Sequence, residues 1–109
     1  MCGIAGVYNQ KNNKLIEAKI VEAMLKKIEH RGPDGSQIKM FDPCALGFNR
    51  LSFLDLEGGM QPIGNEDGSV YMICNGEIFN FNELREELIS KGHVFKTGGD
   101  NFFSWDYIL

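Results

Sequence analysis

The sequence predicts a layered α+β fold, and three observations support this prediction. An apolar stretch typical of a buried strand, Gly3 to Tyr8, begins almost at the first residue. Two amphipathic segments, Leu15 to Ile28 and Asn80 to Gly92, have the spacing of helices. Several short β-prone runs lie between them. This order of strand, helix, several strands and helix favours an α+β domain over a doubly wound parallel sheet.

The first strand is expected to end at the polar turn Asn9 to Asn13. In the helix that follows, two lysines occupy the closing turn, where the helix dipole favours cations. Every fourth residue of this segment is apolar, which predicts the face turned to the core: Ile16, Ile20, Met24 and Ile28. A sheet that is entered at residue 2 would also hold the chain terminus in place, where a free end would fray.

The middle of the chain predicts successive strands, over Ile38 to Phe41, Ala45 to Phe48, Leu51 to Leu56 and Val70 to Cys74, with a turn at Gly64 to Ser69 before the last. Asn80 and Glu83 have the spacing of a capping box at the start of the second helix. Its apolar stripe is Phe81, Leu84, Leu88 and Ile89, and Gly92 closes it. A further strand is possible over Val94 to Lys96.

The size and composition of the chain fit one packed domain. It has 109 residues, 43% of them hydrophobic, and a net charge of −4 from scattered acidic and basic side chains, so no basic face for nucleic acid is expected. No apolar run approaches the roughly 20 residues that span a bilayer, and no signal peptide is visible, which favours a cytoplasmic protein without a membrane partner. Three cysteines and two histidines without a C-x-x-C pair suggest neither disulfides nor a metal site.

Cys2 is the first candidate for chemistry. A side chain this small at position 2 allows the initiator methionine to be removed, which leaves a thiol and a free α-amine on the same Cα. A thiol has a pKa near ~8.5 and needs a base at neutral pH, and an α-amine with a pKa of about 7.7–8.0 can serve as that base. The alternative is that Cys2 is a small packed residue with no chemical role.

Four motifs follow one another at compatible spacings: Cys2-Gly3-Ile4-Ala5-Gly6, His30-Arg31-Gly32-Pro33-Asp34-Gly35, Arg50-Leu51-Ser52 and Asn75-Gly76-Glu77-Ile78-Phe79-Asn80. Together they cover nearly all of residues 2 to 100. This set resembles the class II glutamine amidotransferase domain at the start of glutamine-hydrolysing asparagine synthetases. The form Arg31-Gly32-Pro33-Asp34 is closer to that branch than to the phosphosugar or purine-pathway amidotransferases.

The resemblance implies an N-terminal nucleophile (Ntn) hydrolase fold, a four-layer αββα sandwich. It also implies that Cys2 attacks the side-chain amide of glutamine to form a thioester, with glutamate and ammonia as products. Asn75, through its side-chain amide, and Gly76, through its backbone N–H, would stabilise the oxyanion that develops during this attack. Taken alone, Asn75-Gly76 is first a turn dipeptide.

The resemblance further assigns the groups that hold free glutamine. Arg50 would bind its α-carboxylate in a bidentate manner and Asp100 its α-ammonium. Glu77 and the backbone of Leu51, Ser52, Phe53 and Leu54 would complete the pocket, and Arg31 would support the nucleophile from a neighbouring loop. Without the resemblance, Arg50 and Asp100 would be taken as ordinary solvated charges.

The family domain is nearly twice as long as this chain. The expectation is therefore that residues 1–109 are a partial glutaminase domain, with only about the first half of the sandwich, and that the synthetase domain is absent. No cofactor is expected for glutamine hydrolysis, whereas ATP and Mg²⁺ would be bound by the synthetase domain that receives the ammonia. Two other interpretations stay open: a non-catalytic remnant or interaction module, and an amidotransferase with a sugar or peptide acceptor.

Overall fold

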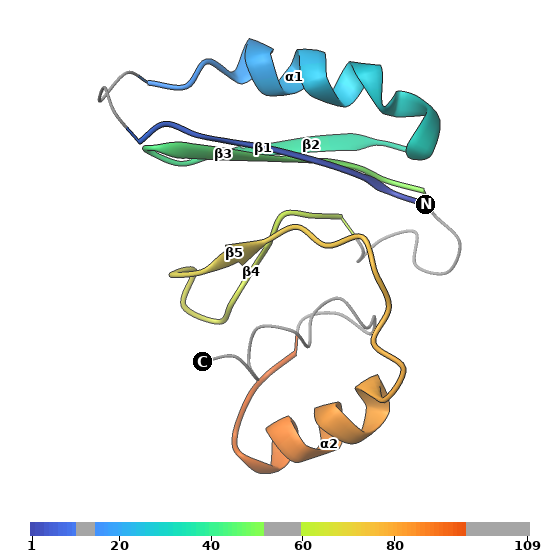
Figure 1. Cartoon of the computed structure of the whole chain (residues 1–109). Helices are drawn as coiled ribbons and strands as arrows, with labels where there is room; N and C mark the ends of the chain where they lie inside the picture. Colours follow the sequence, from blue (N-terminus) through green and yellow to red (C-terminus); the bar gives the residue numbers. More distant parts are fainter. Residues whose placement is uncertain (11–14, 52–59, 96–109) are drawn as a thin grey trace.

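The computed structural model describes residues 1–10, 15–51 and 60–95. Its first sheet has three antiparallel strands in the order β1 (Gly3–Tyr8), β3 (Cys44–Asn49) and β2 (Ser36–Met40). Figure 1 shows helix α1 (Ala18–Lys27) lying along one face of this sheet. On the other side lies a small hairpin of β4 (Ile63–Gly64) and β5 (Tyr71–Met72), with helix α2 (Phe81–Ser90) beyond it. The mixed α and β composition agrees with the predicted class.

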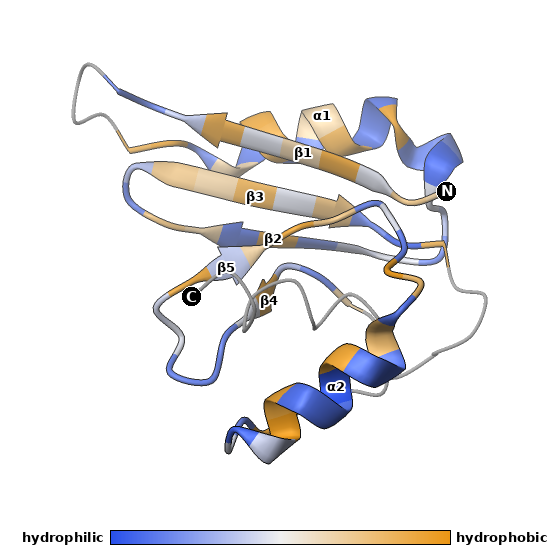
Figure 2. Cartoon of the chain, turned by 60° about the horizontal axis from the view of Figure 1, so that its bottom comes forward, coloured by the Kyte–Doolittle hydropathy of each residue, from blue (hydrophilic) through white to orange (hydrophobic). Residues whose placement is uncertain are grey.

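The strands of the first sheet are largely where the sequence predicts them. β1 matches its predicted bounds, and β3 is one residue longer at each end than predicted. β2 begins two residues and ends one residue before its predicted bounds. Figure 2 shows apolar residues along β1 and β3 and mainly hydrophilic residues in β2. The hydrophilic character of β2 fits its position at an edge of the sheet, and the apolar character of β3 fits its central position. β1 lies at the other edge and is more apolar than its position requires.

The core lies between α1 and the face of the sheet that it covers. Its buried members are Ala5, Val21, Leu25 and Ala45, with Val7, Ile16, Ile28 and Ile38 packed around them. Gly47 lets the helix approach β3 closely, because a Cβ at this position would lie only 2.6 Å from Cγ1 of Val21. Burial of four to eight apolar side chains here is the main force that holds α1 on the sheet.

The predicted core face of the first helix was wrong in its centre. Ile20 and Met24 are 46% and 37% exposed, whereas Val21 and Leu25 are 0% and 3% exposed. A spacing of four residues turns about 40° further at every step of a helix with 3.6 residues per turn, so a four-residue repeat drifts off one face. Leu25 follows Val21 by four residues and Ile28 follows Leu25 by three. This alternation keeps the three side chains on the helix face that meets the sheet.

The opposite face of the sheet is covered only in part. Phe48 is 1% exposed on this face, but Ile4, its partner across the β1–β3 pair, is 44% exposed. The hairpin contacts the sheet at the far end of β2, where the rings of Phe41 and Tyr71 lie 5.0 Å apart and Nζ of Lys39 lies 5.0 Å from the Tyr71 ring centre. The second layer thus shields part of this face.

The β4–β5 hairpin replaces a longer predicted strand. Only Tyr71–Met72 of the predicted run Val70 to Cys74 is a strand, and Gly64, placed in the turn by the sequence, belongs to β4. Asn65 closes the turn, donating from Nδ2 to Oγ of Ser69 and accepting at Oδ1 from the N–H of Val70. Hydrogen bonds from the side chain and backbone of Ser69 hold the pKa of Asp67 below its ordinary value.

Helix α2 begins after Asn80 as predicted, but the predicted capping box does not form, since the Asn80 side chain makes no cap hydrogen bond. Its C-terminus is closed by Gly92, whose φ is 96°. There the N–H of Gly92 bonds to the carbonyl of Ile89 (3.0 Å) and that of His93 to the carbonyl of Leu88 (3.1 Å). These two bonds are the pair found in a Schellman cap.

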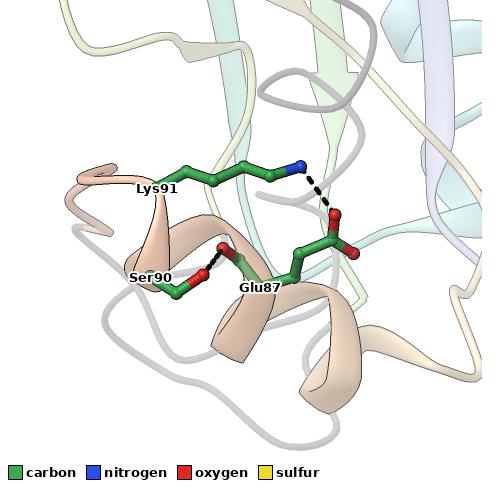
Figure 3. Close-up of polar contacts among 3 residues, drawn as sticks. All are labelled: Glu87, Ser90 and Lys91. Carbon is green, nitrogen blue, oxygen red and sulfur yellow. Dashed lines mark hydrogen bonds and ion pairs between the residues drawn. The ribbon is translucent and has the colours of Figure 1, made fainter.

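Polar contacts at the end of α2 are local. Nζ of Lys91 lies 2.6 Å from Oε1 of Glu87, and Oγ of Ser90 donates to the carbonyl of Glu87 at 2.6 Å. Figure 3 shows both contacts. The Glu87–Lys91 pair is exposed and adds little stability. Beyond the helix, the N–H of Val94 donates to Oε1 of Glu66 in the hairpin turn, which fastens the end of α2 to the hairpin.

Two predicted strands are not part of the described structure. Leu51 is irregular, and the rest of the run Leu51 to Leu56 lies outside the described residues. Val94 and Phe95 are also irregular, so the strand predicted over Val94 to Lys96 is wrong for these two positions, and Lys96 lies outside the described part. In residues 1–10, 15–51 and 60–95, no helix has the length and apolar character needed to cross a membrane.

Candidate functional site

The candidate site lies at one end of the three-stranded sheet, where β1 begins and β3 ends. In the antiparallel register Gly3 is opposite Asn49, so the same pairing places Cys2 beside the residues that follow β3. The backbone N–H of Leu51 donates to Sγ of Cys2, with 3.4 Å between nitrogen and sulfur. The thiol in turn donates to the carbonyl oxygen of Leu51, which lies 3.8 Å from Sγ. Both backbone groups of Leu51 therefore fix the direction of the half-buried thiol.

A second contact holds the backbone of Cys2. Nε of Arg31 donates to the carbonyl oxygen of Cys2 at 3.3 Å. Arg31 ends the short 3₁₀-helix Glu29–Arg31, which continues from the C-terminus of α1. The packing of α1 on the sheet thus determines where this guanidinium lies, and Arg31 is brought next to the candidate nucleophile as the sequence predicts.

The loop that contains Arg31 is bonded directly to the end of β3. The N–H of Asp34 donates to the carbonyl of Arg50 at 2.9 Å, and the N–H of Arg50 donates to the carbonyl of Gly35 at 2.8 Å. Gly32 lies against the same backbone, since a Cβ on it would be 2.4 Å from the carbonyl oxygen of Asn49. Only glycine allows this approach, and the loop and strand end form one unit.

Arg50, the predicted ligand of the glutamine carboxylate, is 8% exposed. This burial rules out the ordinary solvated position that a lone arginine would have on a surface, because a buried guanidinium needs polar or anionic partners. Its neighbour Asn49 is 0% exposed. Nδ2 of Asn49 donates to the carbonyl of Leu25 at 2.7 Å, and Oδ1 accepts from Oγ of Ser36 at 2.7 Å. Asn49 thereby ties the end of α1 and the start of β2 to the site.

The predicted oxyanion donors Asn75 and Gly76, together with Glu77, follow β5 and are exposed. Figures 1 and 2 both show the segment from β5 to α2 passing on the end of the molecule at which the N-terminus lies. This segment is anchored at Cys74, whose backbone N–H donates to Oε1 of Gln61 at 2.5 Å and whose carbonyl accepts from Nε2 of Gln61 at 3.1 Å. Gln61 is 1% exposed.

The structure therefore joins Cys2, Arg31, Arg50 and Leu51 by direct contacts or by backbone continuity. Asn75, Gly76 and Glu77 follow Cys74, which is bonded to Gln61, a residue outside this group. Ser52, Phe53, Leu54 and Asp100, which the sequence also assigns to the pocket, lie outside the described residues. All three cysteines are free thiols, and in the described ranges no three His, Cys, Asp or Glu side chains gather as ligands for a metal ion.

Sequence reasoning overlooked Asn49 and Gln61. Both are uncharged amides, a type that is usually exposed and that no motif singled out. The position of Asn49 at the end of a run of apolar strand residues is the one signal that could have pointed to a buried amide. Gln61 gives no comparable signal, because its partner Cys74 is 13 residues away in the sequence.

Comparison with known proteins adds independent findings. A family model described as the glutamine amidotransferase domain matches residues 1–102. Asparagine synthetase (glutamine-hydrolyzing) 1 of Bacillus subtilis (strain 168) is 41% identical to the chain over 102 residues, which is 92% of this chain and 16% of that protein. The synthetase numbered 2 in the same organism is 42% identical, with 92% and 13% covered.

A plant relative gives a similar result. Asparagine synthetase (glutamine-hydrolyzing) 3 of Arabidopsis thaliana is 38% identical over 100 residues, which cover 92% of this chain and 17% of that protein. The chain thus spans less than a fifth of the length of these curated relatives.

Proposed function

The chain belongs to the family of glutamine amidotransferase domains, and on this basis we propose that it hydrolyses glutamine to glutamate and ammonia with Cys2 as the nucleophile. The observation that carries this proposal is the position of the Cys2 thiol. Sγ lies 3.4 Å from the backbone nitrogen of Leu51, directly after the buried Arg50. The candidate nucleophile thus contacts the backbone of the residue that directly follows a buried cation, and a guanidinium can bind a carboxylate.

The free amine that the reaction requires arises when Met1 is removed. While Met1 is present, the nitrogen of Cys2 is part of the peptide bond to Met1. Met1 is 72% exposed, so this bond lies at the surface. After cleavage the new α-amine would belong to the residue directly before β1, whose carbonyl accepts a hydrogen bond from Arg31. The amine and the thiol then form the base and the nucleophile of a single residue.

The proposed chemistry has two halves. The amine takes the thiol proton, the sulfur attacks the side-chain amide carbon of glutamine, and the carbonyl oxygen takes up the displaced electron pair. When this oxyanion collapses, the C–N bond breaks and the leaving nitrogen receives the proton from the α-ammonium, so ammonia departs and a thioester remains. A water molecule, deprotonated by the same amine, then attacks the thioester and releases glutamate and the thiol.

The other site residues are proposed to bind glutamine and the oxyanion. Asn75 Nδ2 and the N–H of Gly76 would donate to the oxyanion, and loss of one such donor costs about 10²–10³ in kcat in other enzymes. Arg50 would bind the α-carboxylate and Asp100 the α-ammonium. Glu77 and the backbone from Leu51 to Leu54 would form the remaining walls of the pocket.

The wider context is part of the same proposal. The ammonia would pass to a synthetase domain or subunit that forms asparagine, and ATP and Mg²⁺ are assigned to that partner. The glutaminase steps themselves use only groups of this chain. The order of layers in Figure 1, α1, sheet, hairpin and α2, supports the αββα sandwich of N-terminal nucleophile hydrolases as the complete architecture.

The test is a comparison of two cysteine substitutions. Cys2→Ala should reduce glutamate release from glutamine to the background rate, because it removes the nucleophile. Cys44→Ala is the matched control, since Cys44 is also a free, half-buried thiol but lies opposite Tyr8 at the other end of the sheet. It should retain activity close to that of the unmodified chain. Equal glutamate release by the Cys2→Ala variant would refute the proposal.

Mass spectrometry completes the experiment. An electrophilic glutamine analogue should add once to the chain, at residue 2, and only to molecules that lack Met1. A chain that keeps Met1 and forms no adduct would instead support the non-catalytic interpretation.

A further inference from the structure

Gln61 is a buried amide that the proposed reaction does not use directly. Its exposure is 1%, and both polar atoms of its side chain are bonded to one residue, Cys74. Oε1 accepts from the Cys74 N–H and Nε2 donates to the Cys74 carbonyl, at 2.5 and 3.1 Å. A side-chain amide that bonds both backbone groups of another residue acts as a strand neighbour would.

The register of the hairpin explains why this bridge lies where it does. Ile63 pairs with Met72 and Gly64 with Tyr71, so continuing the same register places Gln61 opposite Cys74. Pro62 comes between Gln61 and β4 and has no N–H to donate to a ladder. The side chain of Gln61 therefore extends the pairing two positions beyond the end of β4 and β5, to the residue that immediately precedes Asn75.

Gln61 is also linked to the other half of the site. A Cβ placed on Gly35 would lie 3.0 Å from the terminal methyl of Met60, so Met60 packs against the loop. Gly35 in turn accepts the backbone hydrogen bond from Arg50 at 2.8 Å. A continuous line of contacts thus runs from Arg50 through Gly35, Met60 and Gln61 to Cys74.

We propose that Gln61 is a positioning residue for the oxyanion donors: its side-chain amide fixes the backbone of Cys74 and thereby aims Asn75 and Gly76 at the substrate carbonyl above Cys2. This inference rests on the proposed glutaminase function. Asn75 is one peptide unit from the anchored residue, about 3.8 Å between Cα atoms, so few dihedral angles separate the anchor from the donor. Oxyanion donors act mainly in the transition state, so their displacement lowers kcat more than it raises KM.

The test removes the two hydrogen bonds of the Gln61 side chain and compares the effect on kcat with the loss of two side-chain hydrogen bonds elsewhere in the hairpin. Gln61→Met keeps the length and most of the volume of the side chain but makes neither hydrogen bond. It should lower kcat for glutamate release by about 10- to 100-fold, with KM for glutamine changed by less than about threefold. Asn65→Ala is the matched control, because it also removes two side-chain hydrogen bonds from the hairpin, at the turn. Its kcat should stay within about twofold of the unmodified chain.

A second variant keeps the proposal testable if Gln61→Met does not fold. Gln61→Glu retains the shape of the side chain, but its ionised form cannot donate to the Cys74 carbonyl. A protonated carboxyl can restore both bonds, so the kcat of this variant relative to that of the unmodified chain should rise as the pH falls. A purely structural role would lower the amount of folded protein without this change in the pH profile.

The possible failures can be told apart. If the unmodified chain releases glutamate and the Gln61 variants match it in kcat, or if Asn65→Ala lowers kcat as much as they do, the positioning role is wrong and the glutaminase function stands. If the unmodified chain with a free Cys2 releases no glutamate, the proposed function fails and the positioning role fails with it.

Discussion

Substitution of Gly32 by alanine gives the sharpest test of how the site is assembled. A Cβ on Gly32 would lie 2.4 Å from the Asn49 carbonyl oxygen, 2.5 Å from the Asn49 carbonyl carbon and 2.8 Å from the Arg50 carbonyl carbon. Optimal contacts between such atoms are about 3.5–4.0 Å, so the loop and the strand end must separate by about 1 Å. All three atoms belong to the backbone, so no side-chain rotation can relieve the overlap.

The expected cost follows from that separation. Overpacking of this kind costs about 1–3 kcal/mol. A shift of about 1 Å also stretches the Asp34–Arg50 and Arg50–Gly35 bonds, now 2.9 and 2.8 Å, beyond hydrogen-bonding range. Their loss adds about 1–3 kcal/mol, and the reduced freedom of the unfolded chain offsets about 0.4–1 kcal/mol. Together these contributions span about 1–6 kcal/mol, so we expect Gly32→Ala to lower the free energy of unfolding by a central value of about 3 kcal/mol.

Urea denaturation followed by circular dichroism measures this change. For a slope of about 1.5 kcal/mol/M, a loss of about 3 kcal/mol should lower the midpoint by roughly 2 M. Gly6→Ala is the matched control, because a Cβ there would lie 3.5 Å from both the Ala45 carbonyl oxygen and Cδ2 of Leu46, which is ordinary contact. Its free energy of unfolding should change by less than about 1 kcal/mol. Equal midpoints for the two variants would show that the loop does not lie against the strand end.

Two further predictions concern the helix face and the hairpin turn. Leu25→Ala should lower the free energy of unfolding by about 2–5 kcal/mol, because Leu25 is 3% exposed in the core. Met24→Ala, at a 37% exposed position, should lower it by less than about 1 kcal/mol. A larger effect at Met24 than at Leu25 in urea denaturation would favour the helix face predicted from the sequence. The Ser69 hydrogen bonds lower the pKa of Asp67, so Ser69→Ala should raise that pKa toward its ordinary value in an NMR titration. Because a lowered carboxyl pKa stabilises the charged folded form, the contribution of Asp67 is present above its ordinary pKa and is lost as the pH falls through the lowered value; an unchanged titration would contradict the assigned cause.

The family and most of the first sheet could be predicted from the sequence. Four short motifs indicated a glutamine amidotransferase domain, and the family match over residues 1–102 confirms this. β1 was predicted at its observed bounds, because an apolar run of this length that ends at a polar turn is short for a helix. The expected full burial was wrong, since Ile4 and Tyr8 are 44% and 67% exposed. The contacts of Cys2 with Leu51 and Arg31 could not be derived without the fold, since these residues are 49 and 29 positions away from Cys2 in the sequence.

The errors have physical causes as well. The four-residue stripe selected Ile20 and Met24 because hydrophobicity alone does not tell which side of a helix meets the sheet. β4 has only two residues, too few to show any periodicity. Gln61 was missed because its role depends on the register of that short hairpin. The roles assigned to all the site residues remain predictions: Cys2, Arg31, Arg50, Leu51, Ser52, Phe53, Leu54, Asn75, Gly76, Glu77 and Asp100.

The pairing of β1 with β3 has a consequence for how the chain tolerates insertions. The hydrogen-bonded ladder from Gly3–Asn49 to Tyr8–Cys44 also determines which residue meets Leu51. If one residue were added between Cys2 and Gly3, the ladder could remain intact while the thiol moved outward by about 3.4 Å and faced the other side of the sheet. A lengthened chain of this kind would keep the sheet and yet lose the contact of the thiol with Leu51. If Cys2 acts as we propose, the number of residues between it and the first strand is therefore under constraint.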